Sequence, residues 1–161
     1  MIVQDIIDLA ENLAKGERLL GLDVGAKTVG LALSDRGLAV ASPFETLRRG
    51  KLGDDVAALG AICRDRTVGG LVIGLPVNMD GSEGPRCQSV RQFAANLAER
   101  GLDLPAAFWD ERLSTAAVER LLIAEADMTR RRRGQVVDKM AAAYILQGAL
   151  DALATQRKRD A

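Results

Sequence analysis

The sequence predicts an α/β fold built on a mixed sheet, in which three antiparallel strands are followed by two parallel strands and helices cover both faces. Three short apolar runs follow one another near the start of the chain, and later apolar runs alternate with segments of helical periodicity. Strands joined by short links pair antiparallel, whereas a helix between two strands allows them to run parallel. The chain has 161 residues, 48% of them hydrophobic, and we expect residues 1–161 to form a single domain with its own core.

The antiparallel part of the sheet begins with a hairpin. The runs Leu19–Val24 and Val29–Leu33 are joined by a short Gly-Ala-Lys-Thr link and predict two strands folded back on each other. Leu38–Ala41 predicts a third short strand, closed by Ser42-Pro43. Residues 1–15 predict an N-terminal helix that extends the domain. Its apolar face consists of Ile2, Ile6, Leu9 and Leu13.

The middle of the chain alternates between helix and strand. Leu52–Cys63 has one apolar helical face, on which Cys63 is most simply a core residue. Val68–Gly74 predicts a buried strand, and a helix should run from Pro85 to a stop at Gly101. Leu104–Trp109 predicts the last strand of the sheet.

The C-terminal part is predicted to be helical with one interruption. A helix should begin at Ser114 or Thr115, either of which can cap it. Asp127–Gly134 has no apolar periodicity and predicts an exposed loop, followed by the longest helix at Val136–Ala154 and a flexible basic tail at 155–161. The first of these helices should bury Val118, Leu121 and Leu122.

Composition excludes several kinds of chemistry. The chain has no histidine, which removes Ser-His-Asp and Cys-His nucleophiles and any histidine base. Cys63 and Cys87 fit no zinc spacing and are expected to be reduced thiols. No apolar run approaches the length of a membrane span and no signal-peptide pattern is present, so we expect a cytoplasmic protein without membrane contact.

Charge is unevenly distributed along a chain whose net charge is zero. Residues 127–161 contain eight Lys or Arg against four Asp or Glu, whereas the preceding residues contain fourteen against eighteen. The C-terminal end is therefore the part of the chain expected to contact phosphates.

Asp23 is a carboxylate inside an apolar run, with Gly21 and Gly25 beside it. An unpaired buried charge costs several kcal/mol or more, so a partner is expected. The simpler reading is that Asp23 caps a turn at the end of its strand. The alternative is a metal- or phosphate-binding aspartate at the rim of the central sheet.

Two further carboxylates should reach the same sheet edge. Glu111 directly follows the last predicted strand, and ligands of open α/β sheets bind at the carboxyl ends of parallel strands. Asp138 shares a helical face with small apolar residues that should pack on the sheet, although its position in the first helical turn would also favour a negative charge. Three clustered carboxylates need a cation, and oxygen ligands favour Mg²⁺ or Mn²⁺, with two such ions able to hydrolyse a phosphodiester.

Four motifs in order resemble the YqgF/RuvX family of the ribonuclease H-like superfamily, to which the RuvC resolvases also belong. They are Leu22-Asp23-Val24-Gly25, the stretch 72–76 with Asn78 and Asp80-Gly81, the stretch 110–114, and the stretch 138–142. The resemblance covers about residues 17–154. It implies that Asp23, Glu111 and Asp138 are metal-binding catalytic residues. It also implies a bacterial nuclease that either processes the precursor of small-subunit ribosomal RNA or resolves four-way DNA junctions.

Several charged residues have both a functional and an ordinary interpretation. Lys27 and Arg112 are candidates for holding the scissile phosphate, against a plain surface charge for Lys27 and a salt bridge for Arg112. Asp110 could exchange roles with Glu111, since adjacent strand positions face opposite sides.

Asp80 and Glu83 could complete a metal shell, although turn chemistry explains both. Finally, a run of basic residues before the last helix is expected to bind backbone phosphates and consists of Arg130, Arg131, Arg132 and Arg133.

Four functions compete at this point. We expect an endonuclease acting on structured precursor RNA, with ribosomal precursor particles as partners, because symmetric junction cleavage needs a stable dimer and the chain has few aromatic residues for an interface. A monomer or weak homodimer is therefore expected. A non-catalytic RNA-binding assembly factor would gain nothing from clustered acids. Actin-like and sugar-kinase ATPases use a similar hairpin but need two such domains.

Overall fold

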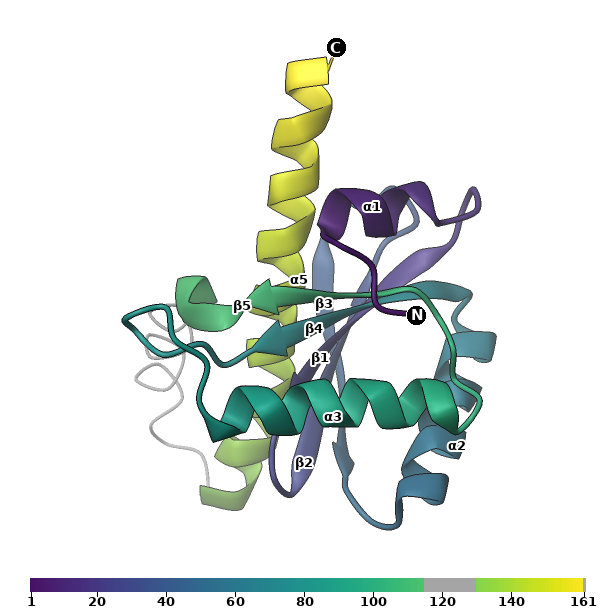
Figure 1. The fold of residues 1–161 in the computed structure, drawn as a ribbon. Helices are drawn as coiled ribbons and strands as arrows, with labels where there is room; N and C mark the ends of the chain where they lie inside the picture. The colour runs from purple at the N-terminus through teal and green to yellow at the C-terminus, as the bar shows by residue number, and fades with distance from the viewer. Residues whose placement is uncertain (115–129, 161) are drawn as a thin grey trace.

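A computed structural model describes residues 1–114 and 130–160, and within them the chain forms a five-stranded mixed sheet (Figure 1). The strand order is β3-β2-β1-β4-β5; β1 pairs antiparallel with β2 and β2 with β3, whereas β4 runs parallel to both β1 and β5. The predicted sheet is therefore confirmed. The strands are β1 (Arg18–Val24), β2 (Thr28–Ser34), β3 (Ala41–Arg48), β4 (Val68–Leu75) and β5 (Ala106–Asp110).

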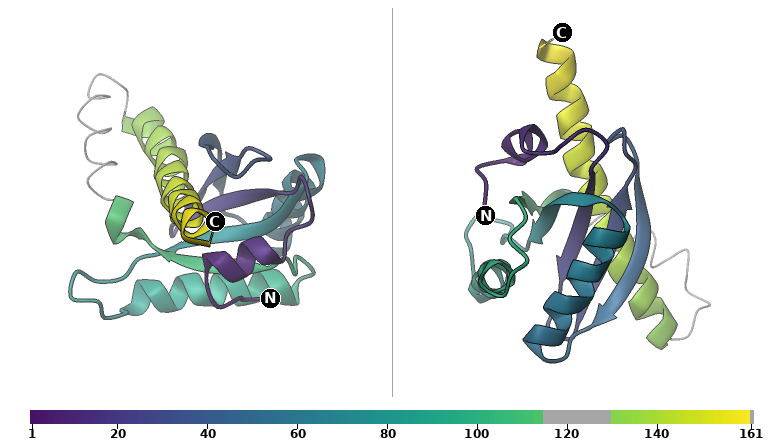
Figure 2. Two further views of the ribbon diagram at one scale, coloured as in Figure 1. Left: turned by 90° about the horizontal axis from the view of Figure 1, so that it is seen from above. Right: turned by 90° about the vertical axis from the view of Figure 1, so that its right-hand side faces the viewer.

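Helices cover both faces of the sheet, as Figure 2 shows from two further directions. Helices α2 and α3 pack on one face, where their apolar residues join those of the strands in one core cluster. Helices α5 and α1 lie on the opposite face over a second cluster. The helical segments are α1 (Ile6–Glu11), α2 (Leu52–Asp65), α3 (Pro85–Glu99), the 3-10 helix η1 (Glu111–Ser114) and α5 (Arg130–Asp160).

The third strand was predicted in the wrong place. Strand β3 begins at Ala41, the residue at which the predicted Leu38–Ala41 strand ends, and continues through Pro43 to Arg48. Proline interrupts a central strand because it lacks an N–H, but β3 is an edge strand, and Pro43 lies where the register with β2 shifts. Ser42-Pro43 is thus inside the strand and does not end it.

The N-terminal helix is shorter than predicted. Helix α1 covers only Ile6–Glu11, capped by the side chain of Asp5. Ile2 instead forms a parallel bridge to Ala106, and the backbone N–H of Val3 donates to the Ala106 carbonyl at 2.8 Å. The first residues therefore cover the outer edge of β5, where a strand with unpaired backbone groups would otherwise be exposed.

Helix α5 is longer at both ends than predicted. Its backbone is helical from Arg130, so residues 130–134 are not a loop, and the helix continues to Asp160, beyond the predicted end at Ala154. In Figure 1 the last turns of α5 extend beyond the rest of the domain. The predicted helix from Ser114 or Thr115, with its core residues Val118, Leu121 and Leu122, lies outside the described residues.

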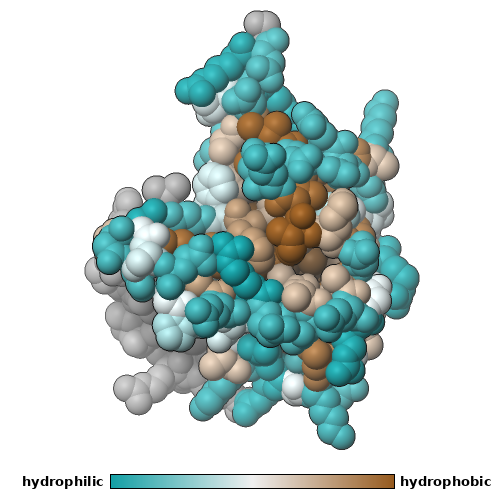
Figure 3. All heavy atoms as spheres, in the orientation of Figure 1, coloured by the Kyte–Doolittle hydropathy of each residue, from teal (hydrophilic) through white to brown (hydrophobic). Residues whose placement is uncertain are grey.

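Apolar surface gathers in one strip on the face seen in Figure 3, between α1 and β5. Ile2 and Ile7, with exposed fractions of 48% and 36%, belong to the N-terminal segment that borders it. Cys63 and Phe93 are buried in the core, as predicted. No helix within residues 1–114 and 130–160 combines the length and the hydrophobicity needed to cross a bilayer.

Helix α5 approaches the sheet most closely at two glycines. A Cβ atom at Gly30 in β2 would lie 2.0 Å from the backbone oxygen of Asp138, and one at Gly21 in β1 would lie 2.8 Å from the Cβ of Leu146. Real Cβ atoms essentially never come so near another atom, so α5 can occupy this position only because both strand residues lack a side chain.

We predict that Gly30→Ala destabilises the protein by at least about 2 kcal/mol, since the new methyl group meets helix backbone that cannot move without shifting α5. For a chain of this length that corresponds to a fall in Tm of roughly 4 to 8 °C. Gly53→Ala is the matched control, because no atom lies within 4 Å of its Cβ position at the start of α2. Thermal unfolding followed by circular dichroism measures both; equal Tm values for the two variants would contradict this packing.

Candidate active site

Asp23 lies near the carboxyl end of β1 and is paired across the sheet with Gly30 of β2. Residues directly opposite each other in a sheet project to the same face, so Asp23 faces α5, as Gly30 does. The alternating neighbours Leu22 and Val24 point the other way, into the core beneath α2 and α3. The apolar run thus buries its aliphatic side chains on one face and presents a half-buried carboxylate on the other.

Glu111 reaches the same place from β5. It is the first residue of η1, directly after the strand, and its Oε2 lies 3.0 Å from where a Cβ at Gly74 would stand. Gly74 belongs to β4, the strand between β1 and β5. The missing side chain at Gly74 therefore lets the Glu111 carboxylate extend across β4 toward Asp23.

Asp138 comes from α5, at the point where the backbone of that helix lies on Gly30. The hydroxyl of Thr28 donates a hydrogen bond of 2.7 Å to Asp138 Oδ2. Thr28 begins β2, so the side chain of Asp138 is held against the start of the strand that pairs with Asp23. The structure therefore brings all three sequence-predicted carboxylates to one end of the sheet.

Asp23 is affected by its burial and by the other two carboxylates. The pKa of Asp23 is raised from 3.8 to about 7, chiefly by burial and then by the charges of Glu111 and Asp138. Burial also raises the pKa of Glu111. Negative charge at this site therefore lowers the stability of the folded protein when no cation is bound. A bound cation would offset this cost and stabilise the fold.

The donor set fits a hard divalent cation. Carboxylate oxygens are the ligands that Mg²⁺ and Mn²⁺ prefer, and Asp23, Glu111 and Asp138 supply them from three different elements. Within residues 1–114 and 130–160, no three acidic or cysteine side chains already stand close enough together to hold an ion.

Arg86 is a candidate site residue that the sequence analysis missed. It lies in the first turn of α3, and its positive charge lowers the pKa of both Asp23 and Glu111. Pro85 at the helix start marks where α3 begins, but nothing in the sequence shows that this turn lies beside the end of β1. Only the packing of α3 on the sheet reveals it.

The other basic candidates lie around this site with different surroundings. Lys27 is exposed in the turn between β1 and β2. Arg112 binds Asp110 through Nε and Nη2, with the Nη2–Oδ2 contact at 2.5 Å, which is the salt bridge considered from the sequence. This contact also lowers the pKa of Asp110 and occupies its carboxylate, while the charge of Asp110 raises the pKa of the adjacent Glu111. The side chains of Arg130–Arg133 are not among those described.

Asp80 and Glu83 have ordinary loop contacts. Asp80 accepts hydrogen bonds from the backbone N–H and hydroxyl of Ser82, and Glu83 forms a paired contact with Arg91 at 2.8 and 2.9 Å. Both interactions lower the pKa of the carboxyl concerned. The Asp80 contacts match the turn chemistry expected from the sequence, whereas Glu83 pairs with an arginine of α3.

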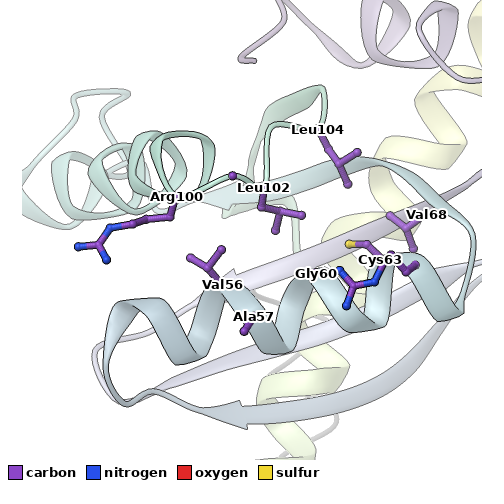
Figure 4. Close-up of a pocket in the computed structure, with 10 residues that line it drawn as sticks. Val56, Ala57, Gly60, Cys63, Val68, Arg100, Leu102 and Leu104 are labelled. Atoms are coloured by element: carbon purple, nitrogen blue, oxygen red, sulfur yellow. The ribbon is translucent and has the colours of Figure 1, made fainter.

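A hollow of about 500 Å³ lies far from the carboxylates, between α2 and the connection from α3 to β5 (Figure 4). Its lining is mainly apolar and includes Val56, Cys63 and Leu102, while Arg100 points away from α2. Val68, at the amino end of β4, also lines it, so it lies at the opposite end of the sheet from Glu111. It offers no carboxylate and is not a candidate active site.

The fold matches a known nuclease structure. The chain superimposes on Thermus thermophilus RuvC, solved in complex with a Holliday junction substrate, with a TM-score of 0.54 and 13% identity over 86% of this chain and 96% of that one. The mixed sheet with helices on both faces therefore has the RuvC-like, ribonuclease H-like fold. At this level of identity the likeness concerns the fold alone.

Sequence comparison assigns the chain to a particular family of this fold. Residues 17–152 match the model of the family described as RuvX: Holliday junction resolvase, and the chain belongs to that family. A protein of Rhodospirillum centenum is 59% identical over 157 residues, covering 95% of this chain and 83% of its own. One of Paramagnetospirillum magneticum is 62% identical over 144 residues, covering 89% and 92% respectively. Both carry the name "Putative pre-16S rRNA nuclease".

We predict that Asp23 makes the stability of the metal-free protein fall as pH rises. Its pKa of about 7 in the folded state exceeds the ordinary 3.8, so the folded protein keeps a proton that the unfolded chain releases, and stability is lost between about pH 4 and pH 7. Asp23→Asn removes this loss. At pH 8, in EDTA, its Tm should exceed that of the unsubstituted protein by more than about 2 °C, the shift produced by 1 kcal/mol.

At pH 4 the two proteins should differ less, because Asp23 is then protonated in the folded state and already partly protonated in the unfolded chain. Adding Mn²⁺ at pH 8 should raise the Tm of the unsubstituted protein and leave that of Asp23→Asn nearly unchanged. A difference between the proteins that does not vary with pH would contradict the assigned burial of this carboxylate.

Proposed function

We propose that this protein is a divalent-metal-dependent endonuclease that hydrolyses phosphodiester bonds, with Asp23, Glu111 and Asp138 as its metal-binding catalytic residues. The observation that carries the proposal is the convergence of these carboxylates at one end of a RuvC-like sheet, where burial and mutual repulsion raise the pKa of Asp23. A nuclease with no histidine needs another source of an activated water. When bound, Mg²⁺ or Mn²⁺ supplies it by lowering the pKa of a coordinated water and neutralising charge on the phosphate.

The protein's own residues supply position and charge. Asp23 is held by the central strand β1. Glu111 follows β5 and extends over Gly74 of β4. Asp138 is oriented by its hydrogen bond from Thr28. Carboxylates fixed on three elements of the domain keep their oxygens at set positions, which favours catalysis because little reorganisation is needed when the substrate binds.

The proposed substrate is the precursor of small-subunit ribosomal RNA, cut within ribosomal precursor particles in the cytoplasm. The curated relatives at about 60% identity carry a name with that activity. The first turn of α5 contains Arg130–Arg133, and Asp138 follows two turns later in the same helix. We propose that these arginines, with Lys27, bind backbone phosphates on either side of the bond that is cut.

Cleavage of four-way DNA junctions is the second candidate, favoured by the family description and by the RuvC-like fold. Resolution requires two symmetric cuts and hence a two-fold dimer. A monomer or weak homodimer suits the RNA activity better, because a single cut needs one site.

We predict that the purified protein with Mn²⁺ cuts a precursor ribosomal RNA and that Asp23→Asn reduces this cleavage below detection while the protein stays folded. Asp54→Asn is the matched control, since Asp54 is an exposed acid in the first turn of α2 and should retain full activity. Gel electrophoresis of the RNA and of a synthetic four-way junction, assayed side by side, measures both activities. Full activity in Asp23→Asn would refute the site, and paired symmetric nicks in the junction with the RNA intact would favour resolution.

A further inference from the structure

Two hollows open at the carboxyl end of the sheet, and both include Arg86 at the start of α3. The larger, of about 520 Å³, extends from Arg86 to Glu111. The smaller, of about 350 Å³, extends from Arg86 to Val24 and Gly25, directly after Asp23. Both volumes lie in the range of about 300 to 1,000 Å³ that is usual for ligand sites. The larger hollow therefore reaches Glu111, the smaller one lies beside the residues that follow Asp23, and Arg86 borders both.

The guanidinium of Arg86 is available to a ligand, unlike those of its neighbours. Arg91 is bound by Glu83, and Arg112 by Asp110. Arg86 is exposed and makes no hydrogen bond or ion pair with the part of the chain that the structure describes. An arginine held close to two carboxylates without pairing to either keeps its full set of planar donors for another acceptor.

The second recess contains another ordered arginine. Arg49 donates from Nη1 to the carbonyl of Gly25 at 2.7 Å, and its guanidinium lies over the ring of Phe93 with 4.9 Å to the ring centre. These contacts fix Arg49 beside the turn that follows Asp23. The smaller hollow is therefore positively charged along its wall, which suits a neighbouring phosphate of the same strand.

The larger recess has an apolar wall. Met79, with an exposed fraction of 87%, lines it together with Val77 and Pro76. An apolar side chain at the edge of a charged site offers a contact surface to a sugar or base, whereas a free inorganic ion would gain nothing from it. The two recesses thus differ in character, with charge on one side of Arg86 and apolar surface on the other.

We propose that Arg86 holds the phosphate of the bond to be cut, and that the nucleotides on its two sides lie in the two hollows that share it. This inference rests on the proposed nuclease function and assigns a substrate-binding residue to it. Arginine suits the role because its planar fork binds two phosphate oxygens at once. A cation here also offsets the repulsion between the phosphate and the acids, and its field already reaches both Asp23 and Glu111.

The test compares Arg86→Gln with Arg100→Gln, which removes the same charge from the opposite end of α3, where Arg100 is exposed. Binding of a short fluorescein-labelled single-stranded RNA is measured by anisotropy in EDTA over a range of salt concentrations. Mn²⁺ binding without nucleic acid is measured by electron paramagnetic resonance. Neither measurement requires cleavage, so both remain informative if the protein cuts neither substrate.

Arg86→Gln should weaken RNA binding at least threefold and reduce the log–log salt slope by about 0.7, the value for one phosphate contact on a single strand. Mn²⁺ binding should stay equal or become tighter, because a positive charge beside the acids is removed. Arg100→Gln should change neither. Equal RNA affinity and slope in the two variants would overturn the proposal, and so would a joint loss of RNA and Mn²⁺ binding with a lowered Tm, which indicates a structural role.

Discussion

The site depends on the contact between the backbone of α5 and Gly30. Because Gly30 has no side chain, the helix lies directly on β2, and the residue making this contact is Asp138 itself. Gly30 is also the partner of Asp23 in the adjacent strand. One close approach therefore sets the distance between two of the three acids. The third acid relies on the same device, since Glu111 extends over Gly74 on the other side of Asp23.

This arrangement concentrates negative charge where the fold alone does not balance it. Burial and two neighbouring carboxylates raise the pKa of Asp23, and Arg86 opposes this only in part. Such a cluster of carboxylates opposes folding and favours cation binding. The attraction between a cation and a carboxylate is stronger in a partly buried site than in water, and a bound cation stabilises the folded state. In the proposed substrate site, Arg86 holds a phosphate beside the same cluster. Under this proposal, stability, metal binding and substrate binding are coupled through a few residues at one end of the sheet.

The sequence predicted those parts whose pattern is local. The hairpin, the strand–helix alternation and the three acids were all visible, because Asp23 interrupts an apolar run and Glu111 directly follows a strand. Strand β3 was misplaced because Pro43 is tolerated at a sheet edge, and whether a strand is central or at an edge is not a local property. The start of α5 was missed because four arginines carry no apolar periodicity. Arg86 was missed because its position beside the carboxylates depends on where α3 packs against the sheet.

The central claim is that Asp23, Glu111 and Asp138 together bind the divalent metal that the proposed reaction requires. Crystals of the protein soaked in Mn²⁺ test it most directly, because anomalous scattering locates the ions without reference to any assay. The account predicts two ions, about 4 Å apart, with oxygens of all three carboxylates as ligands. Ions bound elsewhere, or a Mn²⁺ site that excludes Asp23, would contradict it.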